Sequence, residues 1–150
     1  MAVQSDTPVS RPTVWLLGCG ILAGPLFLVV WLAQALTRPG FDPTWHPLSL
    51  LSLGELGWIQ IANFVVTGAL YVACAAGMRR VLRKGPGRMW GPILVGALGA
   101  GLITGGVFVT DPGAGFPPGT PAGAPAQISW HGMAHSVGAL LVDDALRLTP

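Results

Sequence analysis

Three long stretches of this chain are apolar and carry no charged residue: residues 14–36, 57–78 and 91–110. At 1.5 Å per helical residue they would extend about 35, 33 and 30 Å, and the hydrocarbon core of a bilayer is about 30 Å thick. A surface helix of a soluble protein keeps a polar face, which these stretches lack. The pattern therefore predicts three full transmembrane helices.

A fourth apolar stretch, residues 129–142, is followed at once by Asp143 and Asp144. Its length as a helix would be about 21 Å, which is too short to cross a bilayer. We therefore expect a partial fourth helix, then a polar tail over residues 143–150, as in a chain truncated inside a larger bundle; the alternative is a re-entrant segment. Residues 1–13 are polar and contain two prolines, which predicts a disordered tail. The predicted fold class is an all-α, polytopic membrane helix bundle.

The positive charges predict the orientation of this bundle. Five of the eight Lys and Arg residues lie between Arg79 and Arg88, in the loop that joins the second and third stretches. Lys and Arg resist translocation, so this loop and the amino terminus are expected in the cytoplasm. Charged residues make up only 9% of the chain, and aromatic residues do not alternate with the cations, which argues against a nucleic-acid partner. The expected partner is the lipid bilayer.

A polar stripe crosses the second apolar stretch. Gln60, Asn63 and Thr67 follow one another at helical spacing and so share one face. In lipid, such a face is expected to turn toward another helix, within the chain, in a second copy or in another protein, and to bond with it. The alternative is that the stripe lines a path for a substrate.

The chain's three histidines and one aspartate are all expected at the outer side of the membrane. His131 and His135 are one helical turn apart, and Asp111 follows the third stretch, where the helix dipole disfavours a carboxylate. With His46 they could hold zinc and a water molecule, with Asp111 as the catalytic base and Ser49 and Ser52 orienting a substrate. The simpler interpretation is that the histidines bond with lipid headgroups or loop carbonyls.

Two further segments have a predicted role in packing. Residues 47–54 are short, amphipathic and end in glycine, which predicts an interfacial helix lying on the membrane. Gly101 and Gly105, one turn apart in the third stretch, predict a face where another helix packs closely. Residues 113–125, dense in Gly and Pro, predict a loop without regular structure.

Several short motifs together resemble the family called domain of unknown function 998. They are Phe41-Asp42, His46-Pro47-Leu48-Ser49, Leu53-Gly54, Trp58-Ile59-Gln60, Asn63-Phe64, Phe108-Val109-Thr110-Asp111-Pro112 and His131-Gly132-Met133-Ala134-His135. The resemblance implies a bacterial plasma-membrane protein of about six helices with no assigned activity. The order of the histidines and Asp111 is also similar, more loosely, to alkaline ceramidase-like membrane hydrolases, which would imply zinc on His46, His131 and His135 with Asp111 as the acid.

These observations support three hypotheses about function. The first is a structural or accessory multi-pass membrane protein, an incomplete member of its family. The alternative is a metal-dependent hydrolase that acts on lipid at the outer leaflet. The third is a small-molecule transporter, for which Pro25 within the first stretch and the Gln60 stripe are the only signals.

Overall fold

The computed structural model describes residues 9–85, 87–125 and 127–148, and within them the chain is helical with no strand. Its elements in chain order are α1 (Arg11–Thr37), the 3-10 helix η1 (Leu48–Ser52), α2 (Gly57–Val81), α3 (Gly87–Val107) and α4 (Trp130–Arg147). Among the described residues, α1, α2 and α3 are long and apolar enough to cross a membrane. The predicted all-α bundle with three full spans is confirmed.

The bounds of the predicted segments differ by a few residues from those observed. Helix α1 begins at Arg11, so residues 11–13 are helical and do not belong to the predicted tail, of which residues 1–8 lie outside the described residues. Pro12 stands at the start of α1, where its missing N–H costs no hydrogen bond. Helix α3 begins at Gly87 and ends at Val107, three residues before the predicted end.

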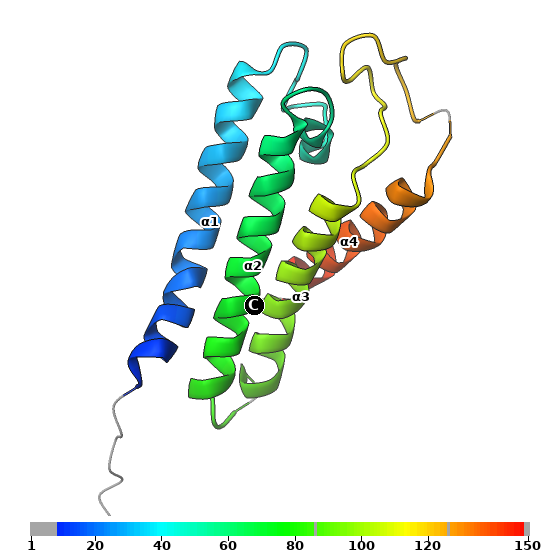
Figure 1. The fold of residues 1–150 in the computed structure, drawn as a ribbon. Coiled ribbons are helices and arrows are strands. Elements are labelled where there is room, and N and C mark those ends of the chain that lie inside the picture. The colour runs from blue at the N-terminus through cyan, green and yellow to red at the C-terminus, as the bar shows by residue number, and fades with distance from the viewer. Residues whose placement is uncertain (1–8, 86, 126, 149–150) are drawn as a thin grey trace, which may run out of the picture.

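The first three helices stand side by side, and α4 crosses α3 at a tilt (Figure 1). Helices α2 and α3 are in contact at two glycines. A Cβ atom added to Gly68 would lie 2.6 Å from the carbonyl oxygen of Gly99, and a Cβ atom added to Gly99 would lie 2.6 Å from the carbonyl oxygen of Gly68. Helices α3 and α4 meet at Gly101 and Gly138, where a Cβ on Gly101 would lie 2.6 Å from the Gly138 carbonyl oxygen. Gly101 thus belongs to the close-packing face that the sequence predicts.

Helix α1 is the least buried of the three spans. Only four of its residues are buried: Thr13, Ala23, Gln34 and Ala35. Large side chains such as Ile21 and Val29 are 78% and 66% exposed. Helix α1 packs on α2 and η1 along one side, and its remaining surface is apolar and open, as a bilayer requires.

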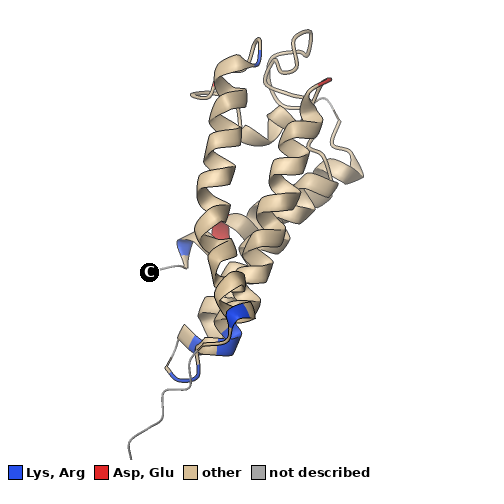
Figure 2. Ribbon diagram, turned by 60° about the vertical axis from the view of Figure 1, so that its left-hand side comes forward, with Lys and Arg blue, Asp and Glu red and all other residues tan. Residues whose placement is uncertain are grey.

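Helix α4 continues beyond the apolar stretch from which it was predicted. It runs through Asp143 and Asp144 to Arg147, so most of the predicted polar tail is helical; residues 149–150 lie outside the described residues. The reason is that Ala145 is buried and extends the face of α4 that also buries His135 and Gly138, while the two aspartates are exposed. The carboxyl end of α4 lies at about mid-height of the bundle (Figure 2).

The two ends of the bundle differ in structure. We call the end with the short α2–α3 connection the hairpin end, and the opposite end, with the segments 38–56 and 108–129, the loop end. At the loop end the two segments pack on each other around Phe116, which is 1% exposed and contacts Phe41 edge to face at 5.5 Å between ring centroids. Arg38 donates hydrogen bonds to the carbonyl oxygens of Leu51 and Leu53 and lies 5.6 Å from the centre of the Phe116 ring.

At the loop end, one prediction about the segments was wrong and another is made more specific. Leu50 and Leu51 of η1 are buried against Phe41 and Phe116, so this element is not the amphipathic helix lying on the membrane that was expected, because its central leucines complete a protein core. Residues 113–125 contain no helix, as predicted, but they are folded back on themselves by a hydrogen bond of 2.6 Å from the Ala114 amide to the Gly123 carbonyl.

Candidate ligand pocket

The polar stripe of α2 is turned toward α1. Gln60 and Thr67 are fully buried and Asn63 is 4% exposed. The Gln34 side-chain amide of α1 donates to Gln60 Oε1 at 2.7 Å, and Asn63 Nδ2 donates to the carbonyl oxygen of Phe27 at 3.2 Å. Thr67 in turn donates to Asn63 Oδ1 at 3.4 Å. The stripe therefore forms a chain of hydrogen bonds between two spans in a medium that offers no water as an alternative partner.

His46 uses both ring nitrogens within the loop end. Its Nδ1 accepts from the Asp42 amide at 2.8 Å, so the proton sits on Nε2, which donates to the Ala114 carbonyl oxygen at 2.9 Å. The ring also packs between Phe41 and Phe116 at 5.4 and 5.7 Å between centroids. His46 thus joins the two loop segments, and neither nitrogen has a lone pair free for a metal ion.

Asp111 lies at the start of α4, four residues beyond the end of α3. Its Oδ2 accepts from the Ser129 amide at 2.8 Å and lies against Gly132, where a side chain would collide with the carboxylate. Ser129 is the N-cap residue of α4 and accepts from the Gly132 amide at 3.0 Å. The conflict expected between Asp111 and the end of α3 is therefore resolved by the amino terminus of α4, which favours a negative charge.

Protonation of Asp111 should loosen this end of α4. Hydrogen bonding with Ser129, with smaller contributions from His131 and His135, holds the pKa of Asp111 below its ordinary value of 3.8. A depressed pKa gives stability that is complete above the ordinary value and is lost as the pH falls through the folded-state value. The expected result is that Asp111→Asn lowers thermal stability at pH 6, with the difference from wild type shrinking below pH 3.8. A difference in thermal stability that stays constant from pH 6 down to about pH 3 would contradict this role of Asp111.

The four residues proposed as a zinc site do not form a ligand set. Among the described residues no group of three or more His, Cys, Asp or Glu side chains is arranged to hold a metal ion. His131 instead lies on the exposed face of α4, with its ring 3.7 Å from that of Trp130 between centroids. The simpler interpretation agrees better with the contacts, since His46 and His135 bond to backbone carbonyls.

His135 is the one member of that set that faces a cavity. It is 8% exposed, and its Nδ1 lies 3.1 Å from the Gly105 carbonyl oxygen and 2.9 Å from that of Phe108. Carbonyl oxygens only accept, so Nδ1 carries the proton, and in the neutral ring Nε2 keeps a lone pair. Nε2 has no hydrogen-bond partner in the part of the chain that the structure describes.

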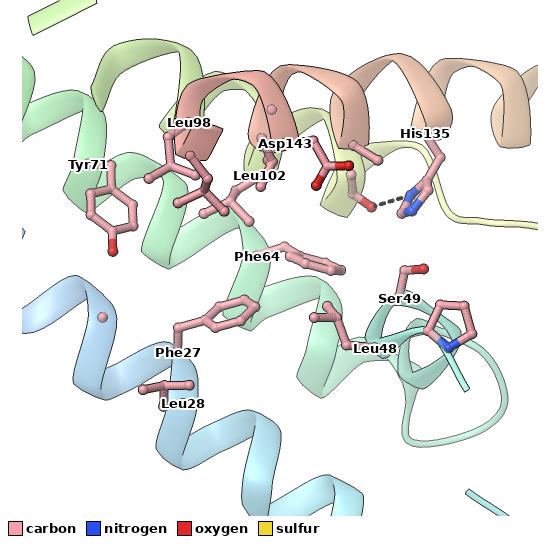
Figure 3. A pocket seen from close by; sticks show the side chains of 17 residues that line it. Phe27, Leu28, Leu48, Ser49, Phe64, Tyr71, Leu98, Leu102, His135 and Asp143 are labelled. Carbon is pink, nitrogen blue, oxygen red and sulfur yellow. Dashed lines mark hydrogen bonds between the residues drawn. The ribbon is translucent and has the colours of Figure 1, made fainter. Parts of the chain in front are cut away.

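The cavity beside His135 has a volume of about 610 Å³ and lies between α1 and α4, with α2 and α3 behind it. Figure 3 shows Phe64 of α2 between Phe27 on one side and α4 on the other, with Ser49 near the His135 end. Of the 17 lining residues, four carry polar side chains: Ser49, Tyr71, His135 and Asp143. Its size and its few polar groups in an apolar lining are those of a small-molecule pocket.

Sequence reasoning identified His135 and Ser49 but missed the pocket as a whole. Most of its lining is Phe, Leu and Gly within or beside the spans, and nothing in an apolar stretch distinguishes a side chain that lines a cavity from one that faces lipid. The polar stripe, proposed as an alternative substrate path, does not line the pocket: Gln60 and Asn63 bond to α1, and Thr67 bonds to Asn63.

These features define a multi-pass α-helical membrane protein with a pocket between its helices. The chain belongs to the family described as "Protein of unknown function (DUF998)", which matches residues 21–143. No curated protein and no solved structure matches the chain, and the similarity to alkaline ceramidase-like hydrolases is not shown.

Proposed function

We propose that this protein binds an amphiphilic, lipid-like molecule in the pocket between α1 and α4. The observation that carries the proposal is a buried imidazole with one unpartnered nitrogen at the edge of an apolar cavity of about 610 Å³. A ligand group that donates a hydrogen bond to this nitrogen would give it a partner inside the apolar pocket. The proposed role is that of an accessory membrane protein, which binds rather than transforms its ligand.

The polar groups of the pocket suggest the chemistry of the ligand. His135 Nε2 without a hydrogen is an acceptor, and the oxygens of a carboxylate such as that of Asp143 also accept. A ligand with a hydrogen-bond donor, such as a long-chain alcohol, satisfies them, whereas a fatty acid anion would meet a second negative charge. The apolar lining contacts the rest of the ligand through Phe27, Phe64 and Leu102.

The hydrolase and transporter hypotheses have less support in the contacts. A metal-dependent hydrolase would need His46 and Asp111 near His135, yet both are engaged elsewhere at the loop end. A path for a transported solute along Gln60 would need that stripe to be open, and it is bonded to α1. No specific observation favours either activity over ligand binding.

Photolabelling in nanodiscs tests the proposal. The probe is hexadecanol that carries a diazirine, and a hexadecane with the same diazirine is the apolar comparison. We expect the alcohol to label peptides from α2 and α3 that line the pocket. Ala139→Trp, which places an indole in the pocket, should reduce this labelling about tenfold, because a bulky side chain would fill the space that the probe needs.

Val137→Trp is the matched control, because Val137 is 58% exposed on α4 and does not line the pocket. His135→Phe keeps a ring but removes the acceptor, so it should weaken labelling by the alcohol and leave labelling by the hexadecane probe unchanged. Equal labelling of wild type, Ala139→Trp and Val137→Trp would show that the probe samples only the lipid-facing surface, and the proposal would be abandoned.

We further propose that the protein resides in a bacterial plasma membrane with the hairpin end in the cytoplasm. The support is the distribution of charge: Figure 2 draws most of the Lys and Arg residues at the hairpin end, while Arg38 lies at the loop end and Arg147 ends α4 at mid-height. A reporter fused within the hairpin and found outside intact cells would contradict this orientation.

A further inference from the structure

A second cavity, separate from the ligand pocket, lies at the hairpin end. It has a volume of about 710 Å³ and is lined by the end of α2, the connecting loop and the start of α3. Two guanidinium groups line it, one from each helix: Arg79 in the last turn of α2 and Arg88 in the first turn of α3. Trp90, Met89 and Ile93 supply an apolar side to the same cavity.

The positive charge around this cavity is not neutralised by the described part of the chain. No Asp or Glu occurs between residues 56 and 110, and none of the five cations between Arg79 and Arg88 forms an ion pair with a described residue. Figure 2 shows the acidic residues, coloured red on the ribbon, at the loop end and at mid-height, away from the hairpin end. Five cations so close together repel one another, and a bound anion would relieve that repulsion.

Of the two arginines that line the cavity, Arg88 stands at a position that the dipole of its own helix does not favour. Arg79 stands in the last turn of α2, where the helix dipole favours a cation. Arg88 stands in the first turn of α3, where the dipole disfavours a cation and where no acidic residue occurs. An anion in the cavity would bond to the Arg88 guanidinium and would also be favoured by the amino terminus of α3.

The apolar side of the cavity indicates what kind of anion fits. Met89, Trp90 and Ile93 are 57%, 55% and 39% exposed, and they are continuous with the span that α3 forms. Indole side chains favour the headgroup level of a bilayer, and a guanidinium matches a phosphate with two parallel hydrogen bonds. A ligand with a phosphate next to acyl chains satisfies both halves of this cavity at once.

We propose that the cavity at the hairpin end binds the phosphate of an anionic phospholipid between Arg79 and Arg88, with Trp90 against the start of its acyl chains. This site does not depend on the pocket beside His135. It differs from a general attraction between basic loops and membranes, because it assigns the binding to two of the five cations.

Native mass spectrometry of the detergent-purified protein with added phosphatidylglycerol tests this assignment. Arg79→Gln/Arg88→Gln is compared with Arg83→Gln/Lys84→Gln, which removes the same charge from residues that do not line the cavity. We expect the first pair to weaken binding at least about tenfold and the second less than about twofold. Arg79→Lys/Arg88→Lys keeps the positive charge and therefore the orientation of the protein in the membrane. It should weaken binding by an intermediate factor, because lysine cannot form the two parallel hydrogen bonds of a guanidinium with a phosphate.

Three outcomes would overturn the proposal. Equal weakening by the two Gln pairs would mean diffuse attraction to the whole loop. No change with either pair would mean that phosphatidylglycerol binds elsewhere. Inorganic phosphate that displaces phosphatidylglycerol at comparable concentrations would mean a site for free phosphate, in which the acyl chains and Trp90 take no part. Circular dichroism of each variant verifies that the helices are retained.

Discussion

Gly68→Ala is expected to unfold the bundle at a lower SDS fraction than wild type. The added methyl group would lie 2.6 Å from the Gly99 carbonyl oxygen and 2.7 Å from the Ile103 side chain, so α2 and α3 must separate along their contact. Overpacking of this kind costs about 1–3 kcal/mol, and here the nearest atom belongs to a rigid helix backbone. Unfolding in SDS followed by circular dichroism measures the loss.

Gly18→Ala is the matched control for this experiment. Gly18 also lies within a span, but nothing stands within 4 Å of the position that its Cβ would take. Alanine is favoured over glycine in a helix by about 1 kcal/mol, so this variant should be as stable as wild type or more so. If Gly68→Ala and Gly18→Ala unfold alike, the close contact between α2 and α3 is not what stabilises the bundle.

Phe116→Ala is expected to disrupt the loop end while leaving the spans helical. Phe116 is 1% exposed and is shared by both loop segments through Phe41, His46 and Arg38. Truncating a buried phenylalanine costs about 3–5 kcal/mol, and these segments have few other large buried side chains with which to compensate. Hydrogen exchange should therefore rise in residues 38–56 and 113–125 and stay low within α2.

Trp45→Ala provides the comparison, because Trp45 lies in the same segment but is 70% exposed. A surface substitution of this kind changes stability by about 0.5 kcal/mol or less. Exchange at the loop end that is equally fast in both variants would mean that Phe116 does not organise this end of the molecule.

The spans could be predicted from sequence because their signal is local. Length and apolar character alone identify residues 14–36, 57–78 and 91–110, and the structure moves their ends by only a few residues. The close-packing face at Gly101 followed from the same logic, since small residues one turn apart admit a neighbouring backbone. None of these inferences required knowledge of which helices are neighbours.

The inferences that failed were those that needed one particular partner distant in sequence. Asp111 was assigned to the wrong helix end because its partner, Ser129, is 18 residues away across a loop with no periodic signal. Leu50 and Leu51 were assigned to the membrane surface because Phe116, which covers them, lies in a segment dense in Gly and Pro. The histidines were grouped because they were expected on the same side of the membrane. Residues on one side can still lie far apart, whereas the ligands of a metal ion must lie within a few ångströms of one another.

The sparse burial of α1 has a consequence for how this family can evolve. A helix whose outward positions touch only lipid is free to exchange leucine, isoleucine and valine there without compensating changes elsewhere. Gln34 has no such freedom, because its side-chain amide donates to the buried Oε1 of Gln60 across the contact between α1 and α2. Among relatives, α1 should therefore accumulate substitutions on its lipid-facing side, while positions 34 and 60 change together or not at all.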